Sequence, residues 1–237
     1  MMRRSLIVIG LGACLSAAPA SARDGAWYVG GDFGAVIVED VGFDFGAGPT
    51  LPNSDSQVIV DHDYGFDGAL FVGYDLGTFR LEAEVAYKRA SVDEIESAFL
   101  LPGSPGGSPP PPQIVPDAGG HSSALSFMIN GMLDFGDDDG LGGFVGGGIG
   151  VAGVDFQMRP FDNGPHFIDD GDTRLAWQIV AGGRKAIADN IDITLRYRFF
   201  NVANVKTVDF GGFESETRFR SHSLLGGITF NFGAPPP

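Results

Sequence analysis

The stretch FRLEAEVAYKRA, residues 79–90, alternates between apolar and charged side chains along most of its length. One parity holds Phe79, Leu81, Ala83, Val85 and Tyr87, and the other holds Arg80, Glu82, Glu84 and Lys88. Alternation with a period of two is typical of an extended strand with two unlike faces. A soluble protein would bury the apolar face, whereas a protein surrounded by lipid would turn it outward. The rest of the chain decides between these arrangements.

The first 22 residues are predicted to be a secretory signal peptide. Arg3 and Arg4 precede the apolar run SLIVIGLGACL, and Ala20-Ser21-Ala22 has the small-x-small pattern of a cleavage site. We therefore expect one domain at residues 23–233 and a Pro-rich tail at 234–237. LGAC also resembles a lipoprotein processing box, so processing at Cys14 is an open alternative. No later apolar run approaches the roughly 18 residues that a membrane helix needs.

The predicted mature chain is strongly acidic. Removal of Arg3 and Arg4 leaves 13 basic residues against 30 acidic ones, a net charge of −17. This charge argues against nucleic acid as a partner, because phosphate binding needs the opposite sign. The single cysteine, Cys14, lies in the signal peptide, so ordinary cleavage leaves no disulfide or thiolate metal site.

Seven further segments follow the pattern of residues 79–90. They lie at residues 26–38, 64–76, 122–135, 141–154, 173–185, 190–200 and 221–232. The segment 141–154 is so rich in glycine that its two faces stay unassigned. Of the 15 prolines, seven fall in the low-complexity tract 101–116 and none falls in a proposed strand, where it would remove a ladder hydrogen bond.

The connections between these eight segments alternate in length. Long ones at about 40–63, 91–121, 155–172 and 201–220 alternate with short ones at 77–78, 136–140 and 186–189. Short turns at one end and long loops at the other are typical of outer-membrane barrels. We therefore predict an all-β fold, an eight-stranded antiparallel up-and-down transmembrane β-barrel with both termini on the periplasmic side.

The cost of burying charge in lipid decides which face points outward. A charged side chain facing lipid near mid-depth costs on the order of 2–4 kcal/mol, so several would consume the stability of a domain. We therefore expect an inward network of ion pairs formed by Asp67, Arg80, Glu82, Glu84, Lys88, Arg174, Arg184, Asp192, Arg196 and Arg198. An eight-stranded barrel is just wide enough for such side chains to fill it. A soluble lipocalin-like barrel is the alternative, but it explains the rhythm of the connections less well.

Aromatic residues near the strand ends are expected to anchor the barrel at the membrane interfaces. The candidates are Trp27, Tyr28, Tyr64, Tyr74, Tyr87 and Trp177.

The strand pattern resembles the OmpA-like and opacity-type outer-membrane β-barrel domains of Gram-negative bacteria. The segments that carry the likeness are WYVGGDFG (27–34), FVGGGIGVAGV (144–154), IDITLRYRFF (191–200) and HSLLGGITFNFGAPPP (222–237). The resemblance covers essentially the whole mature chain and implies the fold more specifically than the function.

The last predicted strand is similar to the terminal signal that barrel-insertion machinery reads in such proteins. Gly227, Phe230 and Phe232 have the spacing of that signal, while Leu225 stands where a polar residue is usual. The residues GAPPP that follow resemble the linker to a peptidoglycan-binding domain. We expect no such domain here.

Two acidic runs and one His-Ser pair are the candidates for chemistry. Asp137–Asp139 and the group Asp169, Asp170 and Asp172 have oxygen ligands for a hard cation but lack the full spacing of a calcium loop, so we predict solvated turns and no metal site. The sequence His121-Ser122-Ser123 resembles the catalytic pair of a lipid A deacylase, with Asp117 or Glu96 as the carboxylate that a hydrolase needs. His62, His166 and His222 look isolated in the sequence. We predict no catalytic residue and no cofactor.

These patterns together predict a non-enzymatic outer-membrane barrel with a structural or surface-interaction role. It would display four long acidic extracellular loops on a barrel filled with side chains. The expected partners are outer-membrane lipid and lipopolysaccharide, the barrel-insertion machinery, and a host or environmental ligand at the loops. A small-solute pore is the first alternative, and a lipid-modifying enzyme is the second.

Overall fold

The computed structural model describes residues 25–45, 56–101, 103–106, 112–136, 141–161, 164–209, 212 and 214–232. Within these ranges the chain forms antiparallel strands, and no helix is long and apolar enough to cross a membrane. The strands are β1 (Trp27–Val38), β2 (Val41–Phe45), β3 (Ser56–His62), β4 (Gly65–Asp75), β5 (Phe79–Ser97), β6 (Gln113–Pro116), β7 (Gly119–Gly136), β8 (Leu141–Arg159), β9 (Ile168–Ala188), β10 (Ile191–Val208) and β11 (Glu214–Phe232). The predicted signal peptide 1–22, the acidic run 137–139 and the tail 234–237 lie outside the described residues.

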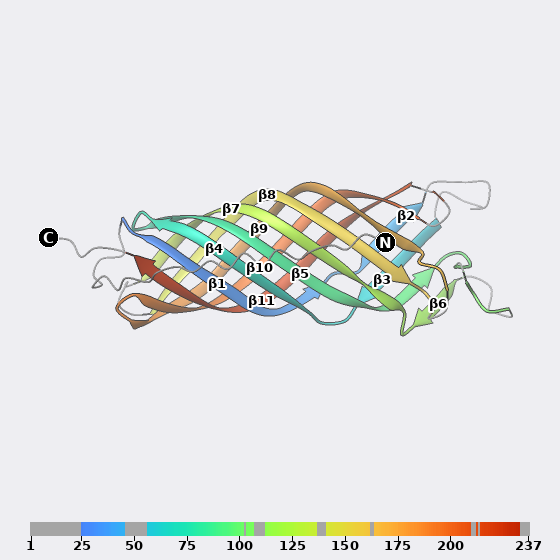
Figure 1. Ribbon diagram of the computed structural model, residues 1–237, viewed down its shortest axis with the longest axis horizontal. Helices are drawn as coiled ribbons and strands as arrows, with labels where there is room; N and C mark the ends of the chain where they lie inside the picture. Colours follow the sequence, from blue (N-terminus) through green and yellow to red (C-terminus); the bar gives the residue numbers. More distant parts are fainter. Residues whose placement is uncertain are drawn as a thin grey trace, which may run out of the picture.

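Eight strands close into a barrel in the order β1, β4, β5, β7, β8, β9, β10, β11 (Figure 1). The ring closes between β1 and β11, which pair from Trp27 opposite Phe232 to Val38 opposite Ser221. Closure pairs the N–H and C=O groups that an open sheet would leave exposed at its edges. The predicted eight-stranded antiparallel barrel is confirmed.

Tight connections join the strands at the end of the barrel that holds Trp27 and Phe232, called the short-turn end. Between β4 and β5, the Leu76 amide donates to the Phe79 carbonyl at 2.8 Å. The amide of Gly77, which has a φ of 93°, donates to the Asp75 carboxylate at 2.8 Å. A positive φ favours glycine, because a side chain would be strained there.

At the opposite end, called the far end, the structure corrects the predicted boundaries. Strands continue into all four connections expected at about 40–63, 91–121, 155–172 and 201–220. β5 continues to Ser97 and β10 continues to Val208. The hairpin of β2 and β3 lies between β11 and β5, so it extends the wall where β1 and β4 have ended.

Two bulges interrupt the alternation in this extension. On β5, three residue steps from Val92 to Ile95 oppose two steps on β3. On β10, three steps from Val202 to Val205 oppose two steps on β11, and Asn204 has a φ of 57°. Each bulge shifts the inward parity by one residue. A period-two pattern read from the sequence therefore stops at these positions although the strands continue.

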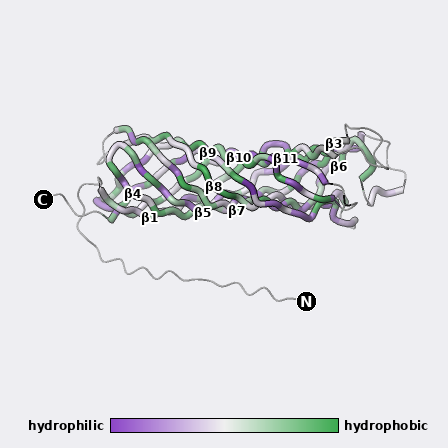
Figure 2. The backbone as a smooth tube through the Cα atoms, turned by 90° about the horizontal axis from the view of Figure 1, so that it is seen from above, coloured by the Kyte–Doolittle hydropathy of each residue, from purple (hydrophilic) through white to green (hydrophobic). Residues whose placement is uncertain are grey.

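The outer face of the barrel is apolar around its circumference. Leu175 is 81% exposed, Ile149 73% and Leu70 67%. The hydropathy of the chain changes from residue to residue along the strands, as Figure 2 shows. Exposed aliphatic side chains on every wall strand are what contact with lipid requires.

The structure assigns both faces of the glycine-rich strand β8. Val145, Ile149 and Val151 point outward and are exposed, while Phe144 points inward and is 3% exposed. A Cβ on the inward Gly148 would overlap the side chain of Asn130 on β7. The glycine residues of β8 therefore make room for larger inward side chains of the neighbouring strand.

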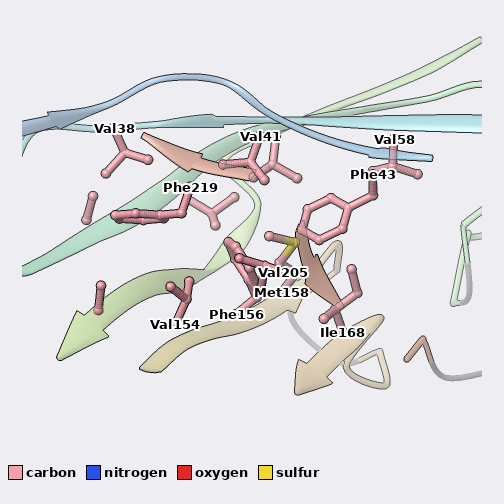
Figure 3. Packing of buried hydrophobic residues seen from close by; sticks show 14 of the residues in the cluster. Val38, Val41, Phe43, Val58, Val154, Phe156, Met158, Ile168, Val205 and Phe219 are labelled. Atoms are coloured by element: carbon pink, nitrogen blue, oxygen red, sulfur yellow. The ribbon is translucent and has the colours of Figure 1, made fainter. Parts of the chain in front are cut away.

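The interior of the far end is an apolar core. Phe156 lies between Phe43 and Phe219, with ring centroids 5.2 and 6.4 Å away (Figure 3). All three rings are fully buried. The same cluster includes Val38, Val41, Val58, Val154, Met158, Ile168 and Val205. This part of the barrel is therefore packed like a soluble β-protein, with its apolar side chains inside.

Candidate functional site

Arg196 on β10 lies at the centre of a buried group of charges in the lumen. Its Nε is 3.2 Å from Asp32 Oδ2 on β1, and its Nη1 is 3.0 Å from Glu82 Oε1 on β5. Nη1 also lies 3.5 Å from Glu84 Oε2. Arg196 is 1% exposed, so these carboxylates replace water as its partners.

Arg198 forms the second half of this group. Its Nη1 donates to both carboxylate oxygens of Asp67 at 3.0 Å, and its Nη2 donates to Glu84 at 2.9 Å. Lys88 Nζ lies 3.8 Å from Asp67 Oδ2 and 3.8 Å from the ring centroid of Phe200. The Ser223 hydroxyl also donates to Asp67, at 2.7 Å.

We call this group the lumenal cluster. It consists of Asp32, Asp67, Glu82, Glu84, Lys88, Arg196 and Arg198, none of which is more than 4% exposed. The residues come from β1, β4, β5 and β10, so the cluster ties walls of the barrel that lie far apart in the sequence. Removing one partner from such a buried set leaves uncompensated charge, which costs several kcal/mol.

Neutral polar side chains complete the lumenal cluster. Gln178 donates to Asn130 at 2.7 Å and to Glu84 at 3.2 Å. The hydroxyl of Tyr28 donates to Glu82 at 3.4 Å. Tyr28 is 1% exposed, so its predicted place at the membrane interface is wrong. Adjacent residues of a strand face opposite ways, and Trp27 takes the outward position.

Three further polar pairs lie toward the short-turn end. Arg80 donates to both oxygens of Asp134, at 2.5 and 2.8 Å. Arg184 Nη1 lies 3.7 Å from Asp75 Oδ2. The Asn231 side chain donates to Asp192 at 3.0 Å. These pairs extend the polar interior to the end of the barrel.

Arg174, expected in the same inward network, does not join it. It lies near the far end of β9, where its Nε is 2.6 Å from Asp172 Oδ2. Its side chain is 36% exposed. The backbone pairing of β9 with β10 ends at Ala176, so the wall no longer encloses Arg174.

The carboxylates of the second acidic run bind backbone rather than remaining in a free turn. Asp172 accepts from the Lys206 amide at 3.0 Å, and Asp170 accepts from the Val208 amide at 2.9 Å. These bonds hold β9 against β10 where their backbone pairing has ended. The hydrogen bond from Lys206 lowers the pKa of Asp172, and Arg174 lowers it further.

The candidate catalytic pair is His121 with Ser123, two residues apart, but the histidine–serine contact in this region joins His62 to Ser122, which lies between them. His62 Nε2 lies 2.7 Å from Ser122 Oγ, so His62 is not isolated. Burial lowers the pKa of His62 to about 4. Ser122 is fully buried and Ser123 is 6% exposed, so neither hydroxyl is accessible to a substrate in this conformation. His166 contacts Arg159 at 2.7 Å, and His222 contacts Tyr197 at 2.8 Å.

The aromatic residues expected to anchor the barrel at the membrane interfaces lie in two groups at different heights along the barrel. Trp27 is 58% exposed and packs edge-on against Tyr74 at the short-turn end, with centroids 5.2 Å apart. Tyr64, Tyr87 and Trp177 lie toward the far end and are 79%, 39% and 42% exposed.

The predicted C-terminal signal lies on β11. Phe232 points outward and is 45% exposed, while Gly227 faces inward. A Cβ at Gly227 would overlap the carboxylate of Asp32. Packing in the lumen therefore requires a glycine at position 227, in addition to the part proposed for Gly227 in recognition by the barrel-insertion machinery.

The comparison with known proteins agrees with this apolar exterior and polar lumen. The sequence model of the family described as outer membrane protein beta-barrel domain matches residues 6–232. The chain belongs to this family. It is therefore an integral protein of the outer membrane, with its short turns and termini toward the periplasm and its far end outside the cell.

Two proteins are similar to this chain in sequence, and one solved structure is similar to it in fold. Outer membrane protein PagN of Salmonella typhimurium is 22% identical over 91% of this chain and 93% of its own. RP828 of Rickettsia prowazekii, described as a candidate adhesin, is 31% identical over 44% of this chain and 48% of its own. The crystal structure of Neisserial surface protein A has a TM-score of 0.52 at 16% identity, covering 88% of this chain and all of that one. This last likeness concerns the fold alone.

Proposed function

We propose that the protein is a non-enzymatic surface-interaction protein, whose barrel anchors a rigid extracellular extension that contacts a host or environmental ligand. The observation that carries this proposal is the apolar core around Phe156. An extension with its own core keeps its outer surface in one arrangement, so binding there does not have to order a loop.

The outer surface of the extension is rich in carboxylates. Exposed or half-buried examples are Glu39, Asp61, Asp63, Asp93, Glu94, Glu96, Asp155, Asp169, Asp170 and Glu216. Such a surface favours a partner with positive charge, because complementary charge speeds encounter and suppresses wrong partners. The description of RP828 as a candidate adhesin supports the same reading for this chain.

The experiment is adhesion by bacteria that display the protein. A non-adherent Gram-negative strain is given the wild-type chain or the double variant Asp93→Asn/Glu96→Gln, which removes two charges from the extension. We expect the wild type to increase attachment to host cells and the double variant to reduce it. The matched control is Asp189→Asn in a periplasmic turn, which should not alter attachment. Attachment equal to the empty strain would overturn the proposal.

The lumenal cluster favours this function over that of a pore. Its seven side chains are buried, and their mutual contacts occupy the lumen that a solute would need. Purified protein in planar bilayers should therefore give no steady conductance. Steady single-channel currents would instead favour the small-solute pore.

The burial of Ser123, the serine of the candidate catalytic pair, likewise favours a non-enzymatic role over a lipid-modifying one. Mass spectra of lipid A should be the same with and without overexpression of the protein. Loss of an acyl chain from lipid A, abolished by Ser123→Ala, would support the hydrolase instead.

A further inference from the structure

A groove of about 550 Å³ crosses the outer wall of β9, β10, β11 and β2, immediately outside the membrane-facing surface. Its lining includes Asp40, Trp177, Asn201, Asn204, Glu216, Arg218 and Arg220. None of these residues belongs to the lumenal cluster or to the His62–Ser122 pair. We call it the interface groove.

The bulge on β10 shapes the interface groove. The extra residue between Val202 and Val205 bends the strand, and Asn204 at the bulge has a φ of 57°. Backbone pairing between β9 and β10 stops at Ala176 opposite Val202. The wall therefore recedes directly above Trp177, which forms the membrane side of the groove.

The polar groups of the groove combine donors with acceptors. Arg220 donates to Asn201 at 3.0 Å and lies 3.6 Å from Glu39, so it is held in place. Arg218 is exposed and has no hydrogen-bond or ion-pair partner among the described residues. The carboxylates of Asp40 and Glu216 line the same groove.

This mixture indicates which chemistry fits. Sugar hydroxyls both donate and accept, so they can pair with carboxylates, amides and guanidinium groups together. A ligand made only of phosphates would meet two carboxylates and be repelled. An aromatic residue with a polar tip, such as Trp177 at 42% exposure, suits a site that is apolar on one side and wet on the other.

The position of the groove identifies the source of the sugar. On its membrane side the wall continues with exposed apolar residues, Ile179 on β9, Tyr197 on β10 and Leu224 on β11. A lipid whose chains lie against these residues carries its headgroup to the height of the groove. We propose that the interface groove binds the saccharide headgroup of an outer-leaflet glycolipid, with Arg218 paired to an anionic substituent of that headgroup.

The test measures glycolipid bound to the folded full-length protein in phospholipid nanodiscs. Nanodiscs contain either phospholipid alone or phospholipid with a core-bearing lipopolysaccharide, and native mass spectrometry counts the lipopolysaccharide retained. We expect Arg218→Glu to weaken retention by about tenfold, the size expected for losing one charged contact. Trp177→Leu removes the indole on the membrane side of the groove and should weaken retention as well. The matched control is Arg89→Glu, an exposed arginine on β5, which is opposite β10 in the ring.

Two further arms distinguish the sources of the ligand. Lipopolysaccharide lacking its core sugars should be retained no better by the wild type than by Arg218→Glu. The released core oligosaccharide should compete only weakly, because it lacks the acyl chains that bring it to the wall. Equal retention of core-bearing lipopolysaccharide by the wild type and the three variants would overturn the proposal. Tight binding of the free oligosaccharide that Arg218→Glu does not weaken would overturn it as well. The heat-dependent shift in electrophoretic mobility shows that each variant is folded.

Discussion

In the membrane-spanning half of the barrel, Arg196 and Arg198 point inward and Leu195 points outward. In the extracellular half, Phe156 and Phe219 take the inward position and Asp155 and Arg218 lie outside. Apart from β1 and β4, which the β2–β3 hairpin replaces in the wall, the barrel strands continue across this change. Their side chains keep alternating except at the bulges. Strand geometry therefore fixes which residues share a face, while the surrounding solvent decides which face is apolar.

The largest expected effect comes from breaking the lumenal cluster. Arg196→Met leaves Asp32, Glu82 and Glu84 buried without their main partner, and should lower the free energy of unfolding by about 4 kcal/mol. Urea unfolding in detergent micelles or thin bilayers measures it. Arg89→Met, which removes an exposed arginine, is the control and should cost less than about 0.5 kcal/mol. Equal losses in both variants would mean that the cluster contributes no special stability.

Phe156→Ala tests the apolar core of the extension. The cavity should cost about 3 kcal/mol, because Phe156 contacts Phe43 and Phe219. We expect the loss to appear as protease cleavage at the far end of folded protein, while the membrane-spanning half keeps its resistance to unfolding. Simultaneous loss of both halves would show that they unfold as one unit.

A pair of outward substitutions tests the role of the solvent directly. Leu195→Arg, facing lipid, should lower stability by about 2–3 kcal/mol. Ser91→Arg, facing water on the extension, should change it by less than about 0.5 kcal/mol. Unfolding titrations of both variants in the same lipid provide the measurement. A similar cost at the two positions would contradict the proposed boundary of the membrane.

Acid should weaken the extension through His62. The pKa of His62 in the folded protein is about 4, so between pH 6.5 and pH 4 the unfolded chain binds a proton that the folded chain does not. The stability conferred by neutral His62 is present above pH 6.5 and should fall by about 2 kcal/mol at pH 5. Protease sensitivity of the far end against pH reports this loss. His62→Gln should flatten the profile over this range, and an unchanged profile would exclude His62 as the cause.

Much of the fold followed from alternation alone. Residues 79–90 give both faces of the membrane-spanning part of β5, and the connections give the strand order. Alternation also places Asp32 and Asp134 on the inner face, although the network expected from the sequence does not include them. Which carboxylate pairs with which arginine could not be derived, because the partners Asp32 and Arg196 lie on strands far apart in the sequence and meet only after the ring closes.

The sequence pattern does not reveal the extension, for a local reason. The bulges at Val92–Ile95 and Val202–Val205 shift the parity, so Ile95 and Val205 look misplaced in a period-two pattern. The expectation for Arg174 is wrong for a related reason, because its parity is inward but the enclosing wall has ended. The hydrogen bond between His62 and Ser122 joins residues sixty positions apart, and no spacing in the sequence indicates it.

The pairing of β1 with β11 has a consequence for synthesis. The first strand to leave the ribosome finds one of its two neighbours only when the last strand, ending at Phe232, has been made. Until then β1 and the latest strand each carry a row of unsatisfied amides and carbonyls, which lipid tolerates poorly. A prematurely terminated chain cannot close the ring and is therefore unstable in the bilayer, so only complete chains form a stable membrane protein.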